Sequence, residues 1–387
     1  MAGAMISPKR LVAIVASLVL VVIGFAMVAY GFTRKEAHAI SWGLSNVGYT
    51  YLALAAGGAI IIWSVYVILG YRGPKGELDK IVKLGLWFSI VSLIGAGIVI
   101  LAKLTKPLGS IWLILTGFNP ASRIALDVPL ISLYIIILAV QLILMIRAAS
   151  VDIGRVGGIL AVLGIIVAIA LYTNLAQIYG TLASIPGWFE SMPFLAPYFI
   201  ASAILLGAAS QSLFTLPYVW RDKELKGFMA RFYGSAIALA VIAAALLLIW
   251  LMILVSYRPE AWVTYSKIVM GAYASFFWIF GILLGIVATL ILALYAIINR
   301  NVTALIIASM LALITVFSNI YLITIVHQTK IPDVINGLYM EFAYHITLDE
   351  ALMVLGALII WVSLYVLGQT LLPLLPGEKP RRFFIFK

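Results

Sequence analysis

Hydrogen-bonding and aromatic side chains recur along one face of a stretch that begins at Trp42. Trp42, Asn46 and Tyr49 are followed by Ala53 and Gly57, a spacing that places all five on one side of a helix. An amide and a phenol one turn apart can hydrogen-bond a ligand that arrives from lipid. The alternative is an interhelical hydrogen bond with aromatic anchoring at the membrane interface. Deeper in the stretch, small residues would let a second helix approach closely.

Two further groups of polar side chains occur later in the chain. One ends an apolar run and consists of Tyr172, Thr173, Asn174, Gln177 and Tyr179, followed by Pro186, Gly187 and Trp188. The other is a loop that contains Lys106, Pro107, Trp112, Asn119, Pro120, Ser122 and Arg123. Polar side chains at the end of an apolar helix are costly unless they meet partners, a cavity or lipid headgroups. Each group alone is a weak signal.

The elements that must position these residues are membrane helices. Of the 387 residues, 65% are hydrophobic and 10% are charged, against roughly 25% charged in a soluble domain. This composition excludes a water-soluble enzyme, a disordered chain and a nucleic-acid-binding domain, and it predicts an all-α polytopic membrane protein. Ten apolar stretches are long enough to span a bilayer: 11–32, 43–70, 84–103, 128–146, 156–179, 194–217, 232–256, 267–298, 302–326 and 350–372.

The first stretch also has features of a signal peptide. Lys9 and Arg10 precede it, and Ala37, His38 and Ala39 imitate a cleavage site. However, its apolar run is longer than the 7–15 residues of a signal peptide's hydrophobic region, so we expect a retained transmembrane helix.

The charges predict the orientation of the chain. With the N-terminus inside, 17 of the 25 basic residues and 6 of the 14 acidic ones fall in inner segments. The whole net charge of +11 then lies on the cytoplasmic side, and the outer side is neutral. The positive-inside rule therefore predicts both termini in the cytoplasm, a basic tail over 373–387 and an outer segment over 327–349. Long outer segments rich in aromatic and polar residues indicate that function or a partner lies outside.

Taken together and in this order, the three groups of residues resemble the NrfD/PsrC family. These proteins are polysulfide reductase-type membrane subunits of respiratory oxidoreductases that also contain a molybdopterin subunit and an iron–sulfur subunit. The similarity is clearest over residues 42–210. It implies two four-helix bundles over 43–326 within a single membrane domain, with one extra helix at each end, in a prokaryotic cell membrane.

The resemblance also implies a quinone site near the outer face, beside an iron–sulfur subunit docked on the outer loops. Asn46, Tyr49 and Tyr172 match the quinone-site positions of the family, and Trp42 opens the same motif. The residues that would meet the partner are Lys106, Trp112, Asn119, Ser122, Arg123 and Trp188. The chain departs from the family pattern at Lys103, where an acid is usual, at Arg123 in place of proline, and at Asn174 in place of glycine.

The chain itself offers little for holding metal. It has no cysteine, so an iron–sulfur cluster would belong to another subunit. Its three histidines, His38, His327 and His345, all fall at or beyond the outer edge, so we expect neither haem nor another bound metal. The predicted cofactor is therefore a quinone, of a type that the sequence does not identify.

Proton exchange with a quinone needs a route to water at the outer edge. The candidates are His38, Asp127 and Glu190, with Glu36 beside the first of them. Asp127 precedes Val128 and Pro129, a pattern that favours a helix N-cap over a proton carrier. Thr347 and Glu350 have the spacing of a capping box at the start of the last span.

Two other functions compete with a quinone-binding anchor. A secondary transporter would carry helices broken at matching points of two repeats, and no convincing pair is visible. A purely structural anchor would not need Asn46, Tyr49 and Tyr172 to converge. The sequence does not identify the terminal substrate, for which polysulfide, sulfur and tetrathionate are all suitable.

Overall fold

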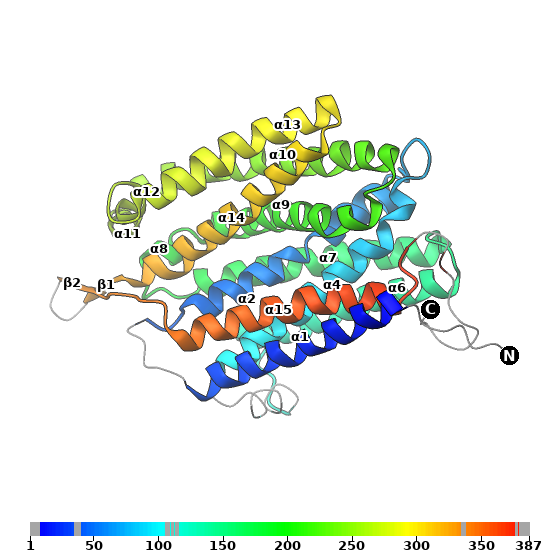
Figure 1. The fold of residues 1–387 in the computed structure, drawn as a ribbon. Coiled ribbons are helices and arrows are strands. Elements are labelled where there is room, and N and C mark those ends of the chain that lie inside the picture. The colour runs from blue at the N-terminus through cyan, green and yellow to red at the C-terminus, as the bar shows by residue number, and fades with distance from the viewer. Residues whose placement is uncertain are drawn as a thin grey trace.

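The computed structural model describes residues 8–34, 40–104, 109, 112, 116–333, 338–375 and 378. Within these residues, ten helices are long and apolar enough to cross a membrane, and they lie roughly side by side (Figure 1). The prediction of an all-α polytopic membrane protein is thus confirmed. Two short strands, β1 (Lys330–Asp333) and β2 (Leu338–Glu341), form an antiparallel hairpin beyond the ninth spanning helix.

The spanning helices are built from the following elements. The first half contains α1 (Pro8–Thr33), α2 (Leu44–Ala55), α3 (Gly58–Ile62), the π-helix η1 (Trp63–Ile68), η2 (Leu78–Lys80), α4 (Val82–Lys103), α6 (Arg123–Arg147) and α7 (Gly154–Gly180). The second half contains α8 (Pro186–Phe189), α9 (Met192–Val219), α10 (Lys223–Ser256), α11 (Pro259–Val269), α12 (Ala274–Phe276), the π-helix η3 (Phe277–Ala288), α13 (Thr289–Asn299), α14 (Val302–Ile325), η4 (Val326–Gln328) and α15 (Leu348–Leu371).

The core helices form two four-helix rings. In the first, α2 packs on α4, α4 on α6, α6 on α7, and α7 on η1, which continues the α2 span. In the second, α9 packs on α10, α10 on α13, α13 on α14, and α14 on α9. The α2 span also contacts α9 and α14, so it lies at the junction of the two rings and is the most buried span.

The first and last helices pack against each other outside these rings. Helix α1 runs along α15, and α15 in turn contacts α4 and α2 (Figure 1). A Cβ added at Gly24 would lie 2.7 Å from the Gly356 carbonyl oxygen, and one added at Gly31 would lie 2.6 Å from that of Asp349. The two glycines therefore allow the backbones to approach closely, as small residues do in membrane helix pairs.

The span beginning at Leu44 is interrupted in its middle. Its helix breaks at Ala56 and Gly57, resumes as α3 and then widens into η1. A Cβ at Gly57 or at Gly207 would collide with the backbone of the facing helix, Ala203 in the first case and Gly58 in the second. The predicted close approach of another helix to this face is therefore confirmed, and the partner is α9.

Three predicted span boundaries differ from the structure. Residues 267–269 belong to α11, a separate amphipathic helix with Pro259 in its first turn, and the spanning helix begins only at Ala274. Helix α10 begins at Lys223 rather than 232, because the Asp222 carboxylate accepts the Leu225 N–H at 3.0 Å and extends the helix into the polar region. Helix α6 begins at Arg123 rather than 128.

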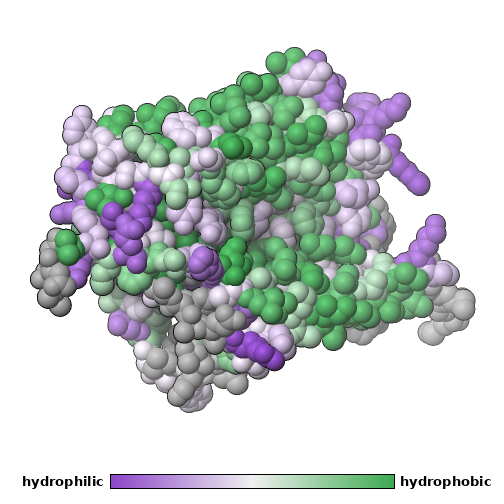
Figure 2. Space-filling view, turned by 60° about the vertical axis from the view of Figure 1, so that its left-hand side comes forward, coloured by the Kyte–Doolittle hydropathy of each residue, from purple (hydrophilic) through white to green (hydrophobic). Residues whose placement is uncertain are grey.

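The start of α1 and the end of α15 lie at the same end of the bundle, and the hairpin, α8 and α11 lie at the opposite end (Figure 1). We call the first of these the inner end and the second the outer end, following the charge pattern of the sequence. Figure 2 shows hydrophobic side chains across the middle of one face and hydrophilic side chains gathered towards its ends. This distribution suits a protein surrounded by lipid.

Candidate functional site

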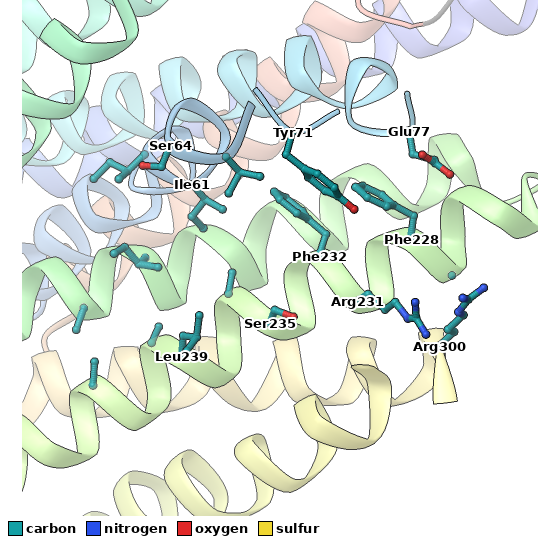
Figure 3. A pocket seen from close by; sticks show the side chains of 18 of the residues that line it. Ile61, Ser64, Tyr71, Glu77, Phe228, Arg231, Phe232, Ser235, Leu239 and Arg300 are labelled. Atoms are coloured by element: carbon teal, nitrogen blue, oxygen red, sulfur yellow. The ribbon is translucent and has the colours of Figure 1, made fainter. Parts of the chain in front are cut away.

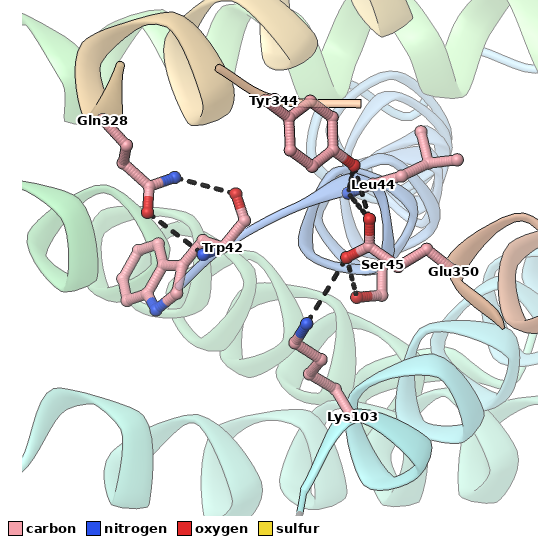
Figure 4. A network of polar contacts seen from close by, with 7 residues as sticks. All are labelled: Trp42, Leu44, Ser45, Lys103, Gln328, Tyr344 and Glu350. Atoms are coloured by element: carbon pink, nitrogen blue, oxygen red, sulfur yellow. Dashed lines mark hydrogen bonds and ion pairs between the residues drawn. The ribbon is translucent and has the colours of Figure 1, made fainter. Parts of the chain in front are cut away.

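Trp42 lies just before α2 in an aromatic cluster at the outer end. Its ring stacks on Trp188 with the centroids 4.9 Å apart and meets Tyr179 edge-on at 5.1 Å. The side chain of Gln328 donates to the Trp42 carbonyl at 2.7 Å and accepts from the Trp42 N–H at 3.0 Å (Figure 4). These contacts fix the start of α2 against α7, α8 and η4.

Tyr179, from the polar end of α7, joins three helices. Its phenol oxygen lies 3.0 Å from the Thr50 hydroxyl of α2 and 3.1 Å from the Thr324 hydroxyl of α14. All three side chains are buried. The polar group at the end of α7 thus meets partners inside the protein, as the cost of burying such groups requires.

Tyr49, Asp127 and Asn174 form a buried hydrogen-bonded chain across α2, α6 and α7. The Tyr49 phenol donates to one carboxylate oxygen of Asp127. The other oxygen accepts from the Asn174 amide at 2.5 Å, and the same amide nitrogen donates to the Arg123 carbonyl at 2.8 Å. Tyr49 and Asp127 are each 5% exposed, and Asn174 is 3% exposed. The chain therefore holds a carboxylate within the membrane-spanning part of the protein.

The interpretation of Asp127 as an N-cap is wrong. Ser122 caps α6, because its side chain accepts the Ala125 N–H at 3.3 Å, and Asp127 lies one turn inside the helix. Pro129 lies further inside the helix and removes one helical hydrogen bond, because it has no N–H to donate. With its capping role taken by Ser122, the Asp127 carboxylate is turned to Tyr49 and Asn174.

Asn46 lies on α2 one turn before Tyr49 and is half-buried. Its Oδ1 atom is inaccessible to solvent and has no hydrogen-bond partner in the described part of the chain. A buried acceptor without a donor costs free energy, on the order of 1–3 kcal/mol. Such an atom therefore marks a position where a ligand hydroxyl or an ordered water would be bound.

Tyr172 lies deeper than Tyr49, at the break between α2 and α3. Its phenol donates to the Ala53 carbonyl at 3.4 Å, and the phenol of Tyr134 on α6 donates to the Ala56 carbonyl at 3.1 Å. Both tyrosines are fully buried. They add a second hydrogen bond to each of two carbonyls at the interruption of the helix, which also accept the N–H groups of Ala56 and Ala59. The structure thus separates Tyr172 from the chain that contains Tyr49.

Glu350 occupies a second polar network at the outer end (Figure 4). Its fully buried carboxylate accepts from the Leu44 N–H at 3.2 Å, the Ser45 hydroxyl at 3.3 Å and the Tyr344 phenol at 2.5 Å, and it pairs with Lys103 at 3.4 Å. Burial and the neighbouring Glu350 carboxylate raise the pKa of Tyr344. The network joins α15 to the start of α2.

The capping box predicted for Glu350 is therefore wrong. Thr347 precedes α15 but makes no side-chain cap. Glu350 instead accepts the Leu44 N–H of another helix, which is one of the unpaired donors at the start of α2. Lys103, where the sequence departs from the family pattern, supplies the positive charge at 3.4 Å.

A protein-family model described as polysulphide reductase, NrfD, matches residues 33–332 and so covers most of the chain. The chain belongs to the NrfD family. A search of curated proteins finds no match to it. Family membership and the ten spanning helices together support the role of a membrane anchor in a polysulfide reductase-type complex. Helix α15 and most of α1 lie outside the matched range.

In this NrfD-family chain, the residues expected to contact a partner subunit differ in how far they are exposed. Trp112 is 67% exposed, and Asn119 is exposed, with its side chain accepting the Ala121 N–H at 3.0 Å. Ser122 and Arg123 are half-buried at the start of α6. Trp188, in contrast, is 1% exposed and donates to the Ile323 carbonyl at 2.6 Å. It therefore packs beneath the outer surface and is not itself accessible to a partner.

The remaining candidates for proton exchange are only partly described. Glu190 lies after α8 and forms an ion pair with Arg258 at 3.4 Å. His38 and Lys106 lie outside the described residues. Of the three candidates for proton exchange, only Asp127 is joined to a predicted quinone-site residue by a hydrogen bond that the structure describes.

Sequence reasoning missed the roles of Asn174, Tyr134 and Glu350. Asn174 was visible as a departure from the family pattern, and the structure shows that this departure supplies the amide that binds Asp127. Tyr134 lies seven residues after Asp127 and so on the same side of α6, which could have connected the two. The long-range partners of Glu350 left no signal in the sequence around it.

Proposed function

We propose that this chain is the quinone-binding membrane anchor of a respiratory oxidoreductase, exchanging electrons between the membrane quinone pool and an iron–sulfur subunit at the outer end. The observation that carries the proposal is the buried, unpartnered amide oxygen of Asn46 one turn from the Tyr49–Asp127–Asn174 chain. Membership of the NrfD family supports the anchor role.

The residues at the outer end of α2 fit a quinone headgroup. A bound quinone supplies two-electron, two-proton chemistry, and its ring oxygens accept or donate hydrogen bonds according to their redox state. Asn46 Oδ1 would accept from a ring hydroxyl, and so would the Tyr49 phenol oxygen, whose own proton is donated to Asp127. Trp42, one turn earlier, would add an aromatic surface. In this proposal, Tyr172 supports the site by holding the helix break at Ala53.

Tyr49 and Asp127 are arranged to move a proton. The Tyr49 phenol already donates to the carboxylate, so it can pass its proton to Asp127 while it receives another from the ligand side. Asn174 keeps the carboxylate in place through the second oxygen. His38 and Glu190 are the candidates for release of that proton at the outer end.

Electrons must leave through another subunit, because the chain has no cysteine to hold an iron–sulfur cluster. We assign the exposed surface around Trp112 and Asn119 to that subunit, which would in turn bind the molybdopterin subunit. Lys106, Ser122 and Arg123 belong to the same outer segment of the sequence. The charge pattern would place this end outside a prokaryotic cell membrane, with both termini in the cytoplasm.

The test is Asp127→Asn in the complex purified with its partner subunits. We expect quinol-linked turnover to fall about 100-fold or more, because the amide cannot accept the proton from Tyr49. Assembly and the quinone extracted from the preparation should be unchanged. Asp152→Asn is the matched control, since it makes the same change at the inner end, where Asp152 pairs with Arg72 at 2.5 Å.

Two results would overturn the proposal. One is turnover of Asp127→Asn within twofold of the unchanged protein. The other is the absence of extractable quinone from both preparations.

A further inference from the structure

A large groove lies at the junction of the two helix rings, and none of the residues that line it belongs to α6, which carries Asp127. It has a volume of about 960 Å³ and is bounded by α3, η1 and the segment after it, by α9 and by α10 (Figure 3). The Arg300 side chain, from the turn between α13 and α14, closes one end. None of the residues assigned to the quinone site lines this groove.

The walls of the groove are apolar over most of their length. They include Ile61 from α3, Ile204 from α9, and Leu239 and Leu247 from α10. From Arg231 to Leu247, α10 rises about 24 Å, against roughly 15 Å for the hydrocarbon of one leaflet. Leu239 is 69% exposed, so the groove opens sideways towards lipid. It can accept an extended hydrocarbon chain along its whole length.

The inner end of the groove is basic. Arg231 lies one turn after Gly227 on α10, and a Cβ at Gly227 would be 3.6 Å from Arg300 Cδ. Arg300 therefore packs across the same face of α10 from which Arg231 projects (Figure 3). Arg300 has a φ of 51°, a left-handed conformation that glycine usually supplies at the end of a helix.

The acidic residues near this end are already engaged. Glu224 pairs with Lys75 at 2.7 Å, and the buried Glu77 carboxylate accepts the Lys75 backbone N–H at 2.8 Å. Arg231 and Arg300 form no ion pair with any described residue, and both are exposed. Two guanidinium groups thus remain available at the mouth of an apolar groove, where the headgroups of the inner leaflet would lie.

We propose that this groove binds one anionic phospholipid of the inner leaflet. Its phosphate lies between Arg231 and Arg300, because guanidinium groups bind phosphate oxygens through paired hydrogen bonds. An acyl chain lies along Leu239 and Leu247, between the two rings. Basic sites of this kind between membrane helices favour anionic headgroups over zwitterionic ones. The proposal does not depend on the quinone site.

The experiment is a lipid titration of the full-length chain, purified in mild detergent, delipidated and followed by native mass spectrometry. The probes are phosphatidylglycerol and phosphatidylcholine with the same acyl chains. We expect one phosphatidylglycerol to bind at least tenfold more tightly than phosphatidylcholine. Arg231→Gln with Arg300→Gln should weaken phosphatidylglycerol binding at least tenfold. The pair Arg147→Gln and Arg155→Gln removes equal charge from exposed positions outside the groove and should change binding less than twofold.

A second variant tests the apolar part of the groove. Ala243→Trp places an indole against the wall of the groove and should weaken the binding of both lipids, while the elution profile stays that of the unchanged protein. Equal loss in the two arginine pairs would overturn the proposal in favour of a general surface attraction. Equal affinity for the two lipids, unchanged binding in Ala243→Trp, or a quinone as the co-purified occupant would also overturn it.

Discussion

At the outer end of the α2 span, Tyr49, Asp127 and Asn174 bind one another, and each is nearly fully buried. At the inner end, beside the same span, a groove with mostly apolar walls has two exposed arginines at its mouth. The outer region orders a few atoms at defined positions, as chemistry requires. The inner region offers volume and charge, as the binding of a lipid requires.

The difference shows that the depth of a polar residue in the membrane determines which hydrogen-bonding partners it needs. A carboxylate at the depth of Asp127 must meet donors within the protein, because lipid supplies none. Arginines at the inner edge meet water and headgroups, so they need no protein partner. A buried polar cluster is therefore a sign of function at the outer end, whereas at the inner end the sign is the groove behind the charges.

The largest effect on folding is expected from Gly207→Val. This substitution tests whether the outer site and the groove both depend on the contact between α9 and the interrupted span. Gly207 faces Gly58 across the contact between α9 and the interrupted span, and a Cβ there would collide with the Gly58 backbone. Separating these helices should disturb both Tyr49 above the break and the groove beside it. We expect loss of monodisperse protein on size-exclusion chromatography, because backbone cannot yield as a side chain can.

Gly158→Ala is the control for this change. It lies in α7 with nothing within 4 Å of an added Cβ, so it should leave the elution profile unchanged. A folded Gly207→Val variant that keeps both quinol-linked turnover and lipid binding would show that the contact is dispensable, and that the two regions are supported independently.

Most of the fold could be predicted from the sequence, because span length and charge asymmetry are properties of short segments. All ten predicted spans end close to the observed helices, and three begin at a clearly different residue; in one of these three, residues 267–273 are wrongly joined to the eighth span. That error arose because residues 268–273, at the end of α11 and in the turn after it, are apolar or small and continue directly into the span. The pairing of α1 with α15 could not be predicted, since it depends on glycines more than 300 residues apart.

The candidate site could be predicted only in part. Trp42, Asn46 and Tyr49 were visible because polar residues at helical spacing stand out within an apolar run. The contact of Tyr49 with Asp127 was not, since it joins residues 78 apart in sequence. The groove left no signal either, because basic residues near helix ends such as Arg231 and Arg300 are ordinary on an inner face.

An intermediate effect on stability is expected from Glu350→Gln. This substitution tests whether the buried Glu350 carboxylate takes part in turnover, as we propose for Asp127, or only stabilises the fold. The amide offers one acceptor oxygen in place of two and removes the charge that faces Lys103. We expect unfolding to be easier by about 2 kcal/mol, seen as a lower thermal midpoint in detergent. Quinol-linked turnover of the folded fraction should change less than twofold.

Ser45→Ala is the matched control, because it removes only the hydrogen bond at 3.3 Å and should lower the midpoint less. If Glu350→Gln instead abolished turnover at an unchanged thermal midpoint, the network around Glu350 would belong to the reactive site. The distinction between a structural and a reactive carboxylate at this end would then be wrong.

The smallest effect on stability is expected from Arg300→Gly. This substitution distinguishes the role of Arg300 in the turn between α13 and α14 from its proposed role in binding the headgroup. Glycine adopts the left-handed φ of 51° without the strain of about 1 kcal/mol that a side chain incurs there, but it loses more conformational entropy on folding. These contributions oppose each other, so the thermal midpoint in lipid-free detergent should move by only a degree or two. Phosphatidylglycerol should still protect the unchanged protein against heat and should protect the variant much less, because a bound ligand stabilises only the state that holds it. Equal protection of both proteins would mean that Arg300 shapes the turn and takes no part in binding the headgroup.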